Sequence, residues 1–216
     1  MSRVLVISPH PDDESIGCGG TVRKHVEAND SVRIIFLTSG EKGGHGRSEQ
    51  ETAHMREREA RTAADILGIG EIEFFRLPDG AVRATSSAVL RLREVLTAWK
   101  PKVIYLPHEG EMHADHRAAV RLLKQALLGI NGYKPRVLMY EIWTPLQQLG
   151  EIVDITPFAR VKRAAIRAYR SQCAVMDFAA AALGLNRYRG EMHSWPGGDY
   201  AEVFCELRLK NGNSRQ

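Results

Sequence analysis

The residues best suited to chemistry lie together near the start of the chain, in the segment Ser8-Pro9-His10-Pro11-Asp12-Asp13-Glu14. Imidazole and carboxylate groups are ligands for divalent ions such as zinc, and a carboxylate that is not a ligand is available as a base. The two prolines restrict the backbone, so the acidic side chains would be oriented at little further entropic cost. Taken alone, the segment is better interpreted as a solvated turn rich in polar caps.

A second group with the same chemistry lies far downstream, at His113, Asp115 and His116. His113 and His116 are three residues apart, so both would project from one face of the first turn of a helix. A site of two histidines and one aspartate leaves a fourth position open for water, which is typical of a catalytic rather than a structural zinc site. Because each group follows an apolar run, one shared metal site is favoured over two unrelated helix caps.

The elements that position these groups follow from the hydrophobic pattern. Strands are predicted at residues 4–7, 32–38, 72–77, 103–106 and 136–142, with helices between them at 15–28, 51–67, 86–99 and 113–128. This alternation predicts an α/β fold with a Rossmann-like, mostly parallel sheet flanked by helices on both faces. Ligands of such sheets bind at the carboxyl ends of the strands, where both groups would meet if strands 4–7 and 103–106 are neighbours.

Beyond residue 143 the pattern is looser. A short strand at 151–155, a basic helix at 158–170 and a closing strand at 201–209 are expected, followed by a frayed tail at 211–216. A chain of 216 residues with 44% hydrophobic and 26% charged residues is typical of one globular domain, here expected to span residues 1–216.

The charge and the cysteine content limit which partners and which cellular compartment are expected. The net charge of +4 is mild and the basic residues form no long run, which argues against nucleic-acid binding. Cys18, Cys173 and Cys205 are widely spaced and predict free thiols in a reducing compartment. No signal peptide precedes Val4 and no apolar run approaches the length of a membrane span, so a cytoplasmic location is expected. The sequence leaves the oligomeric state open, a homo-oligomer included.

Taken together, these motifs resemble the PIG-L/LmbE-like zinc-dependent N-deacetylases. The resemblance rests on Pro9 to Glu14 followed by Gly17-Cys18-Gly19-Gly20-Thr21, and on His113-x-Asp115-His116. Weaker similarity extends over Arg56-x-x-Glu59, Leu77-Pro78-Asp79-Gly80, residues 162–172 and residues 200–204. The resemblance implies an enzyme that removes the N-acetyl group from a small N-acetylglucosamine-type conjugate by means of metal-activated water.

The same resemblance implies a role for each residue that matches the motifs. His10, Asp13 and His116 would bind one zinc ion, although iron or cobalt would fit the same ligands. Asp12 would be the general base. Adjacent residues in a loop point in different directions, so Asp12 and Asp13 can differ in role.

Further implied roles concern the transition state and the sugar. His113, as an imidazolium, would stabilise the oxyanion, with Asp115 holding its ring and Glu14 bracing the loop. Arg56 and Asp79 match positions that contact the sugar, but they could equally be a surface charge and a turn residue.

Two other functions remain open at this stage. A non-catalytic metal- or nucleotide-binding module is disfavoured because the first loop lacks Gly-x-Gly-x-x-Gly. A metal-dependent phosphoesterase is disfavoured because no second acidic ligand cluster is evident, and one bound ion rather than two would separate these functions. The sequence does not identify the sugar conjugate. His45 is expected to face solvent, and His193 and Trp195 are expected in a packed loop rather than a sugar pocket.

Overall fold

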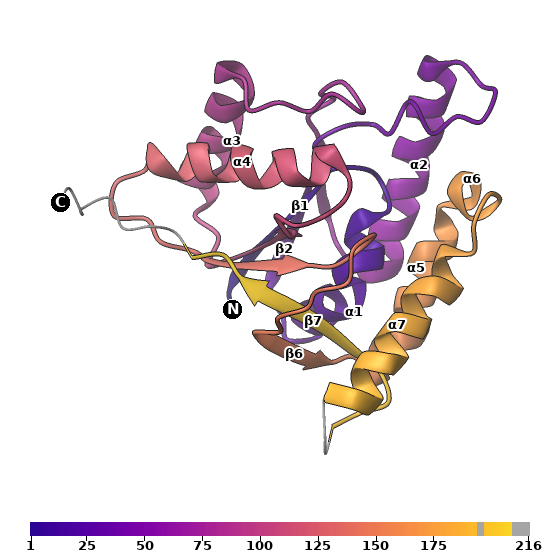
Figure 1. Cartoon of the computed structure of the whole chain (residues 1–216). Coiled ribbons are helices and arrows are strands. Elements are labelled where there is room, and N and C mark those ends of the chain that lie inside the picture. The colour runs from indigo at the N-terminus through magenta and orange to yellow at the C-terminus, as the bar shows by residue number, and fades with distance from the viewer. Residues whose placement is uncertain (194–196, 209–216) are drawn as a thin grey trace.

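A computed structural model, described for residues 1–193 and 197–208, contains a seven-stranded sheet between two layers of helices (Figure 1). The strand order is β3-β2-β1-β4-β5-β7-β6. Strands β1 to β5 pair in parallel, whereas β7 is antiparallel to both β5 and β6. The strands are β1 (Arg3–Ser8), β2 (Ser31–Phe36), β3 (Glu71–Phe74), β4 (Val103–Pro107), β5 (Arg136–Tyr140), β6 (Glu151–Asp154) and β7 (Ala201–Glu206). The predicted fold class is confirmed.

Helices cover both faces of the sheet, with α3 and α4 on one side and α1, α2 and α5 on the other (Figure 1). The α-helices are α1 (Asp13–Glu27), α2 (Glu49–Leu67), α3 (Ser86–Trp99), α4 (Ala114–Leu128), α5 (Ala159–Ala168), α6 (Arg170–Cys173) and α7 (Phe178–His193). The basic helix predicted at 158–170 is interrupted at Tyr169, whose ψ of 63° is not helical. The predictions for Trp195 and for residues 209–216 fall outside the described residues.

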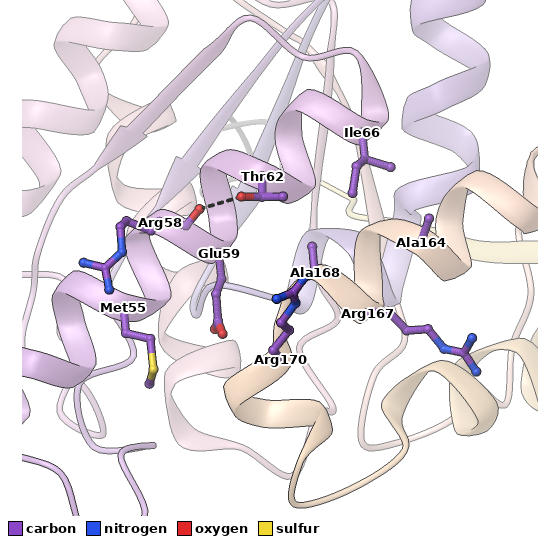
Figure 2. A pocket seen from close by; sticks show the side chains of 9 residues that line it. All are labelled: Met55, Arg58, Glu59, Thr62, Ile66, Ala164, Arg167, Ala168 and Arg170. Carbon is purple, nitrogen blue, oxygen red and sulfur yellow. Dashed lines mark hydrogen bonds between the residues drawn. The ribbon is translucent and has the colours of Figure 1, made fainter.

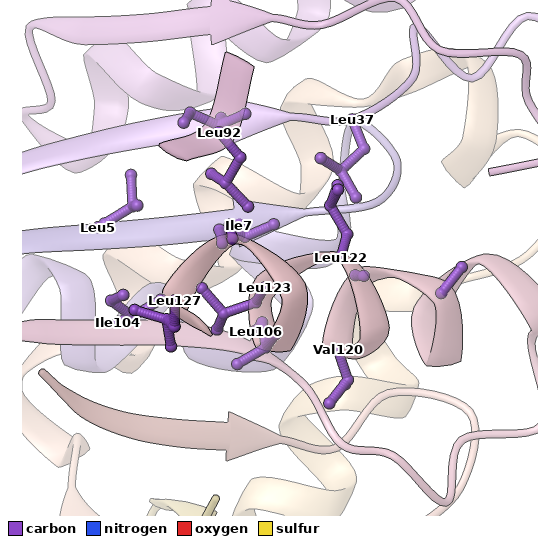
Figure 3. Packing of buried hydrophobic residues seen from close by; sticks show 14 of the residues in the cluster. Leu5, Ile7, Leu37, Leu92, Ile104, Leu106, Val120, Leu122, Leu123 and Leu127 are labelled. Carbon is purple, nitrogen blue, oxygen red and sulfur yellow. The ribbon is translucent and has the colours of Figure 1, made fainter. Parts of the chain in front are cut away.

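The alternation of side chains along each strand divides the core into two parts. Leu5 and Ile7 of β1 pack with α3 and α4, as Figure 3 shows, whereas Val4 and Val6 face α1 and α2. All four side chains are fully buried, as expected for a parallel strand covered on both faces. Strand β1 is therefore a rigid support for the loop that follows it.

The loops that carry the two predicted groups meet because of the strand order. The chain passes from β1 to β2 and β3 on one side, then returns to place β4 beside β1, with Val4 aligned to Val103. This reversal is the topological switch point, where the loops after adjacent strands diverge and leave a crevice. The condition under which the two groups would meet, that strands 4–7 and 103–106 are neighbours, is therefore met.

Helix α1 is kinked at Cys18, which has a non-helical φ of −143°. The kink leaves the N–H groups of Gly20 and Thr21 free, and both donate to the Glu202 carboxylate, at 2.9 and 2.7 Å. Lys162 Nζ contacts Glu202 at 2.6 Å and donates to the Ile16 carbonyl at 2.7 Å. A buried ion pair thus fixes the helix that presents the first group of site residues.

Candidate functional site

His10, Asp13 and His116 converge at the switch point, from the β1 exit loop and the first turns of α1 and α4. Asp13 Oδ2 lies 3.2 Å from His10 Nδ1 and 3.2 Å from His116 Nε2. Asp13 Oδ2 also accepts a hydrogen bond from the His10 main-chain N–H at 2.9 Å. The structure therefore brings together the three side chains predicted to bind a metal.

The donor set fits a divalent cation. Ring nitrogens of His10, His113 and His116 lie within 4.8 Å of one another. His116 is fully buried, and within the described residues neither of its ring nitrogens has a partner with hydrogen-bond geometry. A buried imidazole without hydrogen bonds is costly, and a cation held by the histidines and Asp13 would satisfy it.

The second ring nitrogen of His10, Nε2, is contacted by two buried carboxylates. His10 Nε2 lies 3.1 Å from Asp79 Oδ1 and 3.2 Å from Asp115 Oδ2. Asp115 in turn accepts main-chain N–H groups of Gly80 at 2.7 Å and Val82 at 3.0 Å. A carboxylate that accepts the second ring N–H of a metal-binding histidine fixes its tautomer and orientation. These contacts leave His10 Nδ1 available to a cation.

The predicted pairing of Asp115 with the ring of His113 is therefore wrong in its detail. The Asp115 carboxylate is turned towards His10 and residues 80–82, and the Asp115 main-chain N–H instead donates to His113 Nδ1 at 3.2 Å. His113 lies just outside α4 with extended dihedral angles, φ −75° and ψ 130°, and acts as its N-cap.

The surroundings of His113 disfavour the charge expected on its ring. Burial and the neighbouring His10 and His116 rings lower the pKa of His113. Nδ1 accepts a hydrogen bond, so in the neutral form the ring carries its proton on Nε2. The ring centre of His113 lies 4.7 Å from that of His10.

Asp12 is held in a strained conformation beside Arg56. Its φ of 131° is unusual for a residue other than glycine, and such strain is concentrated at functional sites. Arg56 Nη2 donates to Asp12 Oδ2 at 2.9 Å and to the Pro11 carbonyl at 2.6 Å. Arg56 is only 4% exposed, so the alternative that it is a surface charge is wrong. Asp79 does lie in a turn, as its alternative held, but it is 6% exposed and contacts His10.

The two adjacent carboxyl groups differ strongly in acidity. Burial raises the pKa of Asp12 to about 7, and Arg56 offsets only part of this shift. Burial also favours the neutral form of Asp13, but His116 and His10 hold the pKa of Asp13 well below its usual range. Asp13 therefore remains an anion, as a ligand must, whereas Asp12 can exchange a proton near neutral pH.

Glu14 braces the loop from within the core. Tyr169 and Ser15 donate to its Oε1, each at 2.6 Å, and the Asp12 main-chain N–H donates to Oε2 at 3.2 Å. Ser8 ties the same carboxylate to the end of β1. These contacts agree with the bracing role implied by the sequence.

The sequence interpretation missed Glu111, which is 1% exposed. Its Oε2 lies 3.5 Å from His116 Nδ1, and its Oε1 accepts the N–H groups of Ile142 and Thr144 at 2.8 and 3.2 Å. The sequence did contain a signal for this role, because Glu111 is an acidic residue in a strand-exit loop just before a candidate metal ligand. Glu111 joins His116 to the loop after β5.

His45 and His193 lie away from this cluster. His45 is exposed, as predicted. The prediction that His193 lies in a packed loop is wrong, because His193 is exposed at the end of α7, where its ring lies 5.8 Å from that of Tyr188.

A groove of about 720 Å³ lies between α2 and α5, outside the cluster (Figure 2). Arg58, Arg167 and Arg170 line it together with Glu59. No residue of the histidine–carboxylate cluster lines this groove, so it is not the candidate site. Within residues 1–193 and 197–208, no helix is both long and apolar enough to cross a membrane.

The sequence is similar to a known protein family and to individual proteins. The chain matches the family model PIG-L, described as GlcNAc-PI de-N-acetylase, over residues 5–127. A diacetylchitobiose deacetylase from Thermococcus kodakarensis is 30% identical over 190 residues, which cover 80% of this chain and 70% of the relative.

Solved structures are similar over the whole chain. A conserved protein from Thermus thermophilus has a TM-score of 0.83 and 32% identity, with 100% of both chains covered. A 4-carboxy-2-hydroxymuconate hydratase from Pseudomonas putida has a TM-score of 0.85 and 24% identity, also with 100% of both chains covered. The likeness to the hydratase concerns the fold alone. With the family model covering more than half of the sequence, this chain belongs to the PIG-L family.

Proposed function

We propose that this protein is a zinc-dependent N-deacetylase that hydrolyses the acetamide of a small N-acetylglucosamine-type conjugate. The observation that carries the proposal is the convergence of His10, Asp13 and His116, with the Asp12 carboxylate held by Arg56. A carboxylate that lies next to a set of metal ligands without being one of them is placed to act as a base. Burial, which raises the pKa of Asp12, supports this division of roles. Membership of the PIG-L family and the deacetylase relative support the substrate class.

His10, Asp13 and His116 are the proposed metal ligands. Zinc, when bound, would supply a Lewis acid that polarises the amide carbonyl and lowers the pKa of water. Glu111 orients the His116 ring and Asp115 orients the His10 ring, both from the side away from Asp13. The protein thereby pre-forms the ligand set.

Asp12 and His113 are the proposed catalytic residues. The Asp12 carboxylate, held by Arg56, accepts a proton from the attacking water and passes it to the departing amine. The neutral His113 ring donates its Nε2 hydrogen to the oxygen on which negative charge develops. Asp115 acts indirectly, through the ring of His10 and the position of His113.

The proposed contacts to the sugar involve Arg56 and Asp79. Both lie at the rim of the cluster, where Asp79 links the loop at Lys42 to His10. Arg56 also donates to the Gly40 carbonyl at 3.0 Å, so the two residues position the loop 40–43 that borders the site. Arg56 consequently serves Asp12 as well as any bound sugar.

A single metal ion is proposed, which disfavours a phosphoesterase. His10, Asp79 and Asp115 form a second possible group of ligands, but it shares His10 with the first. Main-chain N–H groups already occupy both oxygens of Asp115 and one of Asp79. These carboxylates act as partners of His10 rather than as a second metal site.

We also propose that residues 1–216 act as one domain in the cytoplasm. Strands from Arg3 to Glu206 contribute to one sheet, which supports a single domain. Cys18, Cys173 and Cys205 are unpaired, which supports a reducing compartment.

An amine-release screen of the zinc-loaded protein tests the proposed function. The substrates are free N-acetylglucosamine and its malate, inositol, nucleotide and oligosaccharide conjugates. We expect equal amounts of primary amine and acetate from at least one conjugate, abolished by a chelator and restored by zinc. Absence of amine from every conjugate, together with phosphate release from phosphate esters, would instead identify a phosphoesterase.

A further inference from the structure

A second cavity, of about 110 Å³, is lined by residues of the first turn of α1 and of the segment that follows β5. Its walls come from α1, the segment after β5, α7 and β7, and they are mainly apolar. The residues used below are Ile16, Ile142, Trp143, Ala181, Leu185 and Asn186. Ligand pockets commonly combine such apolar walls with a few polar groups.

Two direct links connect this cavity to the proposed catalytic residues. The Ile16 main-chain N–H donates to the Asp12 carbonyl at 3.0 Å, so the wall formed by α1 begins one turn from Asp12. The Ile142 N–H donates to Glu111, whose other oxygen faces His116. The walls of the cavity are therefore hydrogen-bonded to the proposed base, Asp12, and to Glu111, which contacts the proposed metal ligand His116.

The cavity has an exposed apolar rim, and one of the residues that line it, Asn186, has an unsatisfied polar atom. Trp143 is 42% exposed and its ring packs edge-on against Phe178, with ring centres 5.7 Å apart. Asn186 is 6% exposed and donates through Nδ2 to the Ala201 carbonyl at 3.0 Å. Its buried Oδ1 accepts no hydrogen bond from any residue in the described ranges. Leaving such an acceptor unpaired is unfavourable, so a ligand with an N–H or O–H group would be stabilised here.

We infer that this cavity binds a compact, branched apolar substituent of the substrate, with a hydrogen-bond donor at its polar end. The inference rests on the proposed deacetylase function. At ~30 Å³ for each water-sized group, the cavity holds about four non-hydrogen atoms, the size of an isobutyl group. The substituent is either the N-acyl chain or the group on the sugar's anomeric oxygen, and the experiment separates these sources.

Paired substrates and two variants at alanine positions test the inference. The zinc-loaded protein is assayed on methyl glycosides of N-acetyl- and N-isobutyryl-glucosamine, and on the isobutyl glycoside of N-acetylglucosamine. One of the two isobutyl-type substrates should exceed the methyl N-acetyl compound about 10-fold or more in kcat/KM, since each extra methylene in a fitting pocket contributes about 10-fold or more. Ala181→Phe, which fills the cavity from an exposed position, should bring this ratio close to 1.

Ala180→Phe is the matched control, because Ala180 is exposed on the same helix but does not line the cavity. This variant should keep the wild-type ratio. Equal kcat/KM values for all three substrates in the wild type, or equal loss of preference in both variants, would overturn the inference while leaving the deacetylase function intact.

Binding of isobutyl alcohol gives a measurement that does not depend on turnover. Methyl-group NMR of the zinc-loaded protein should show shifts at Ile16, Ile142 and Leu185 on addition of isobutyl alcohol but not of glycerol. Ala181→Phe should remove these shifts. If no substrate releases amine, the proposed function fails, and this experiment alone decides whether the cavity takes an apolar group.

Discussion

At the scale of residues, the site depends on opposite environments for two neighbouring carboxyl groups. Asp13 faces the rings of His10 and His116, whereas Asp12 lies at a strained φ of 131° beside Arg56. Replacing each by asparagine changes charge with little change in size. The same substitution should therefore have different consequences at the two positions.

Asp13→Asn should weaken zinc binding because it replaces an anionic ligand with a neutral amide, and excess zinc should partly restore activity. Asp12→Asn should keep the metal while kcat falls ~10²–10⁴-fold, the usual contribution of a positioned general base. Metal content by elemental analysis and kcat at saturating zinc would check both. Loss of zinc from Asp12→Asn but not from Asp13→Asn would reverse the two assignments.

Glu111 offers a test of the support behind His116. Glu111→Gln should reduce zinc affinity about 10–100-fold, the usual effect of losing a carboxylate that orients a metal-binding histidine. Glu109→Gln is the control, because Glu109 lies in the same loop but is exposed and forms an ion pair with Lys124 at the surface. Competition with a chromophoric chelator would measure both affinities. Equal affinities in the two variants would remove Glu111 from the site.

The sequence predicted the residues of the cluster better than their contacts. The Pro-His-Pro-Asp-Asp-Glu motif and the His-x-x-His spacing predicted a metal site with several candidate ligands, and the family resemblance selected His10, Asp13 and His116 among them. The partner of Asp115 was not predictable, because its carboxylate is oriented by the N–H groups of Gly80 and Val82, more than 30 residues away. Glu111 was missed for the same reason: its bonds reach residues 142 and 144.

At the scale of elements, the site depends on helix α1, which is kinked and is held in place by Glu202. The helix is kinked at Cys18, and it packs so closely on Tyr140 that a side chain at Gly17 would collide with the Tyr140 ring. Glu202 then binds the N–H groups that the kink releases. The glycine-rich run at 17–20 indicated a small-residue face, but the capping residue comes from the opposite end of the chain and no local pattern reveals it.

The Lys162–Glu202 pair should therefore be important for stability. Lys162→Met leaves the fully buried Glu202 charge without its cation, which should lower the free energy of unfolding by about 3–5 kcal/mol. Lys124→Met, which removes one partner of an exposed pair, should cost at most about 1 kcal/mol. Denaturant unfolding of both variants would compare them. Similar unfolding midpoints would show that the buried pair is dispensable.

At the scale of the whole molecule, the strand order decides where chemistry is possible. Strands β1 to β5 were predictable because each is a short apolar run between helical patterns. Their order is that of a doubly wound sheet, in which the chain returns to place β4 beside β1. The hydrophobic pattern alone does not reveal this return. The insertion of β7 between β5 and β6 was not predictable, since it depends on antiparallel pairing between distant segments.

The central claim is that one metal ion binds to His10, Asp13 and His116 at this switch point. Anomalous diffraction at the zinc absorption edge, from crystals of the zinc-loaded protein, tests it most directly. We expect a single peak per chain within coordination distance of these three residues, about 2.0–2.2 Å, with Asp12 outside that shell. A second peak, or a single peak bound by Asp79 and Asp115 in place of Asp13 and His116, would contradict the claim.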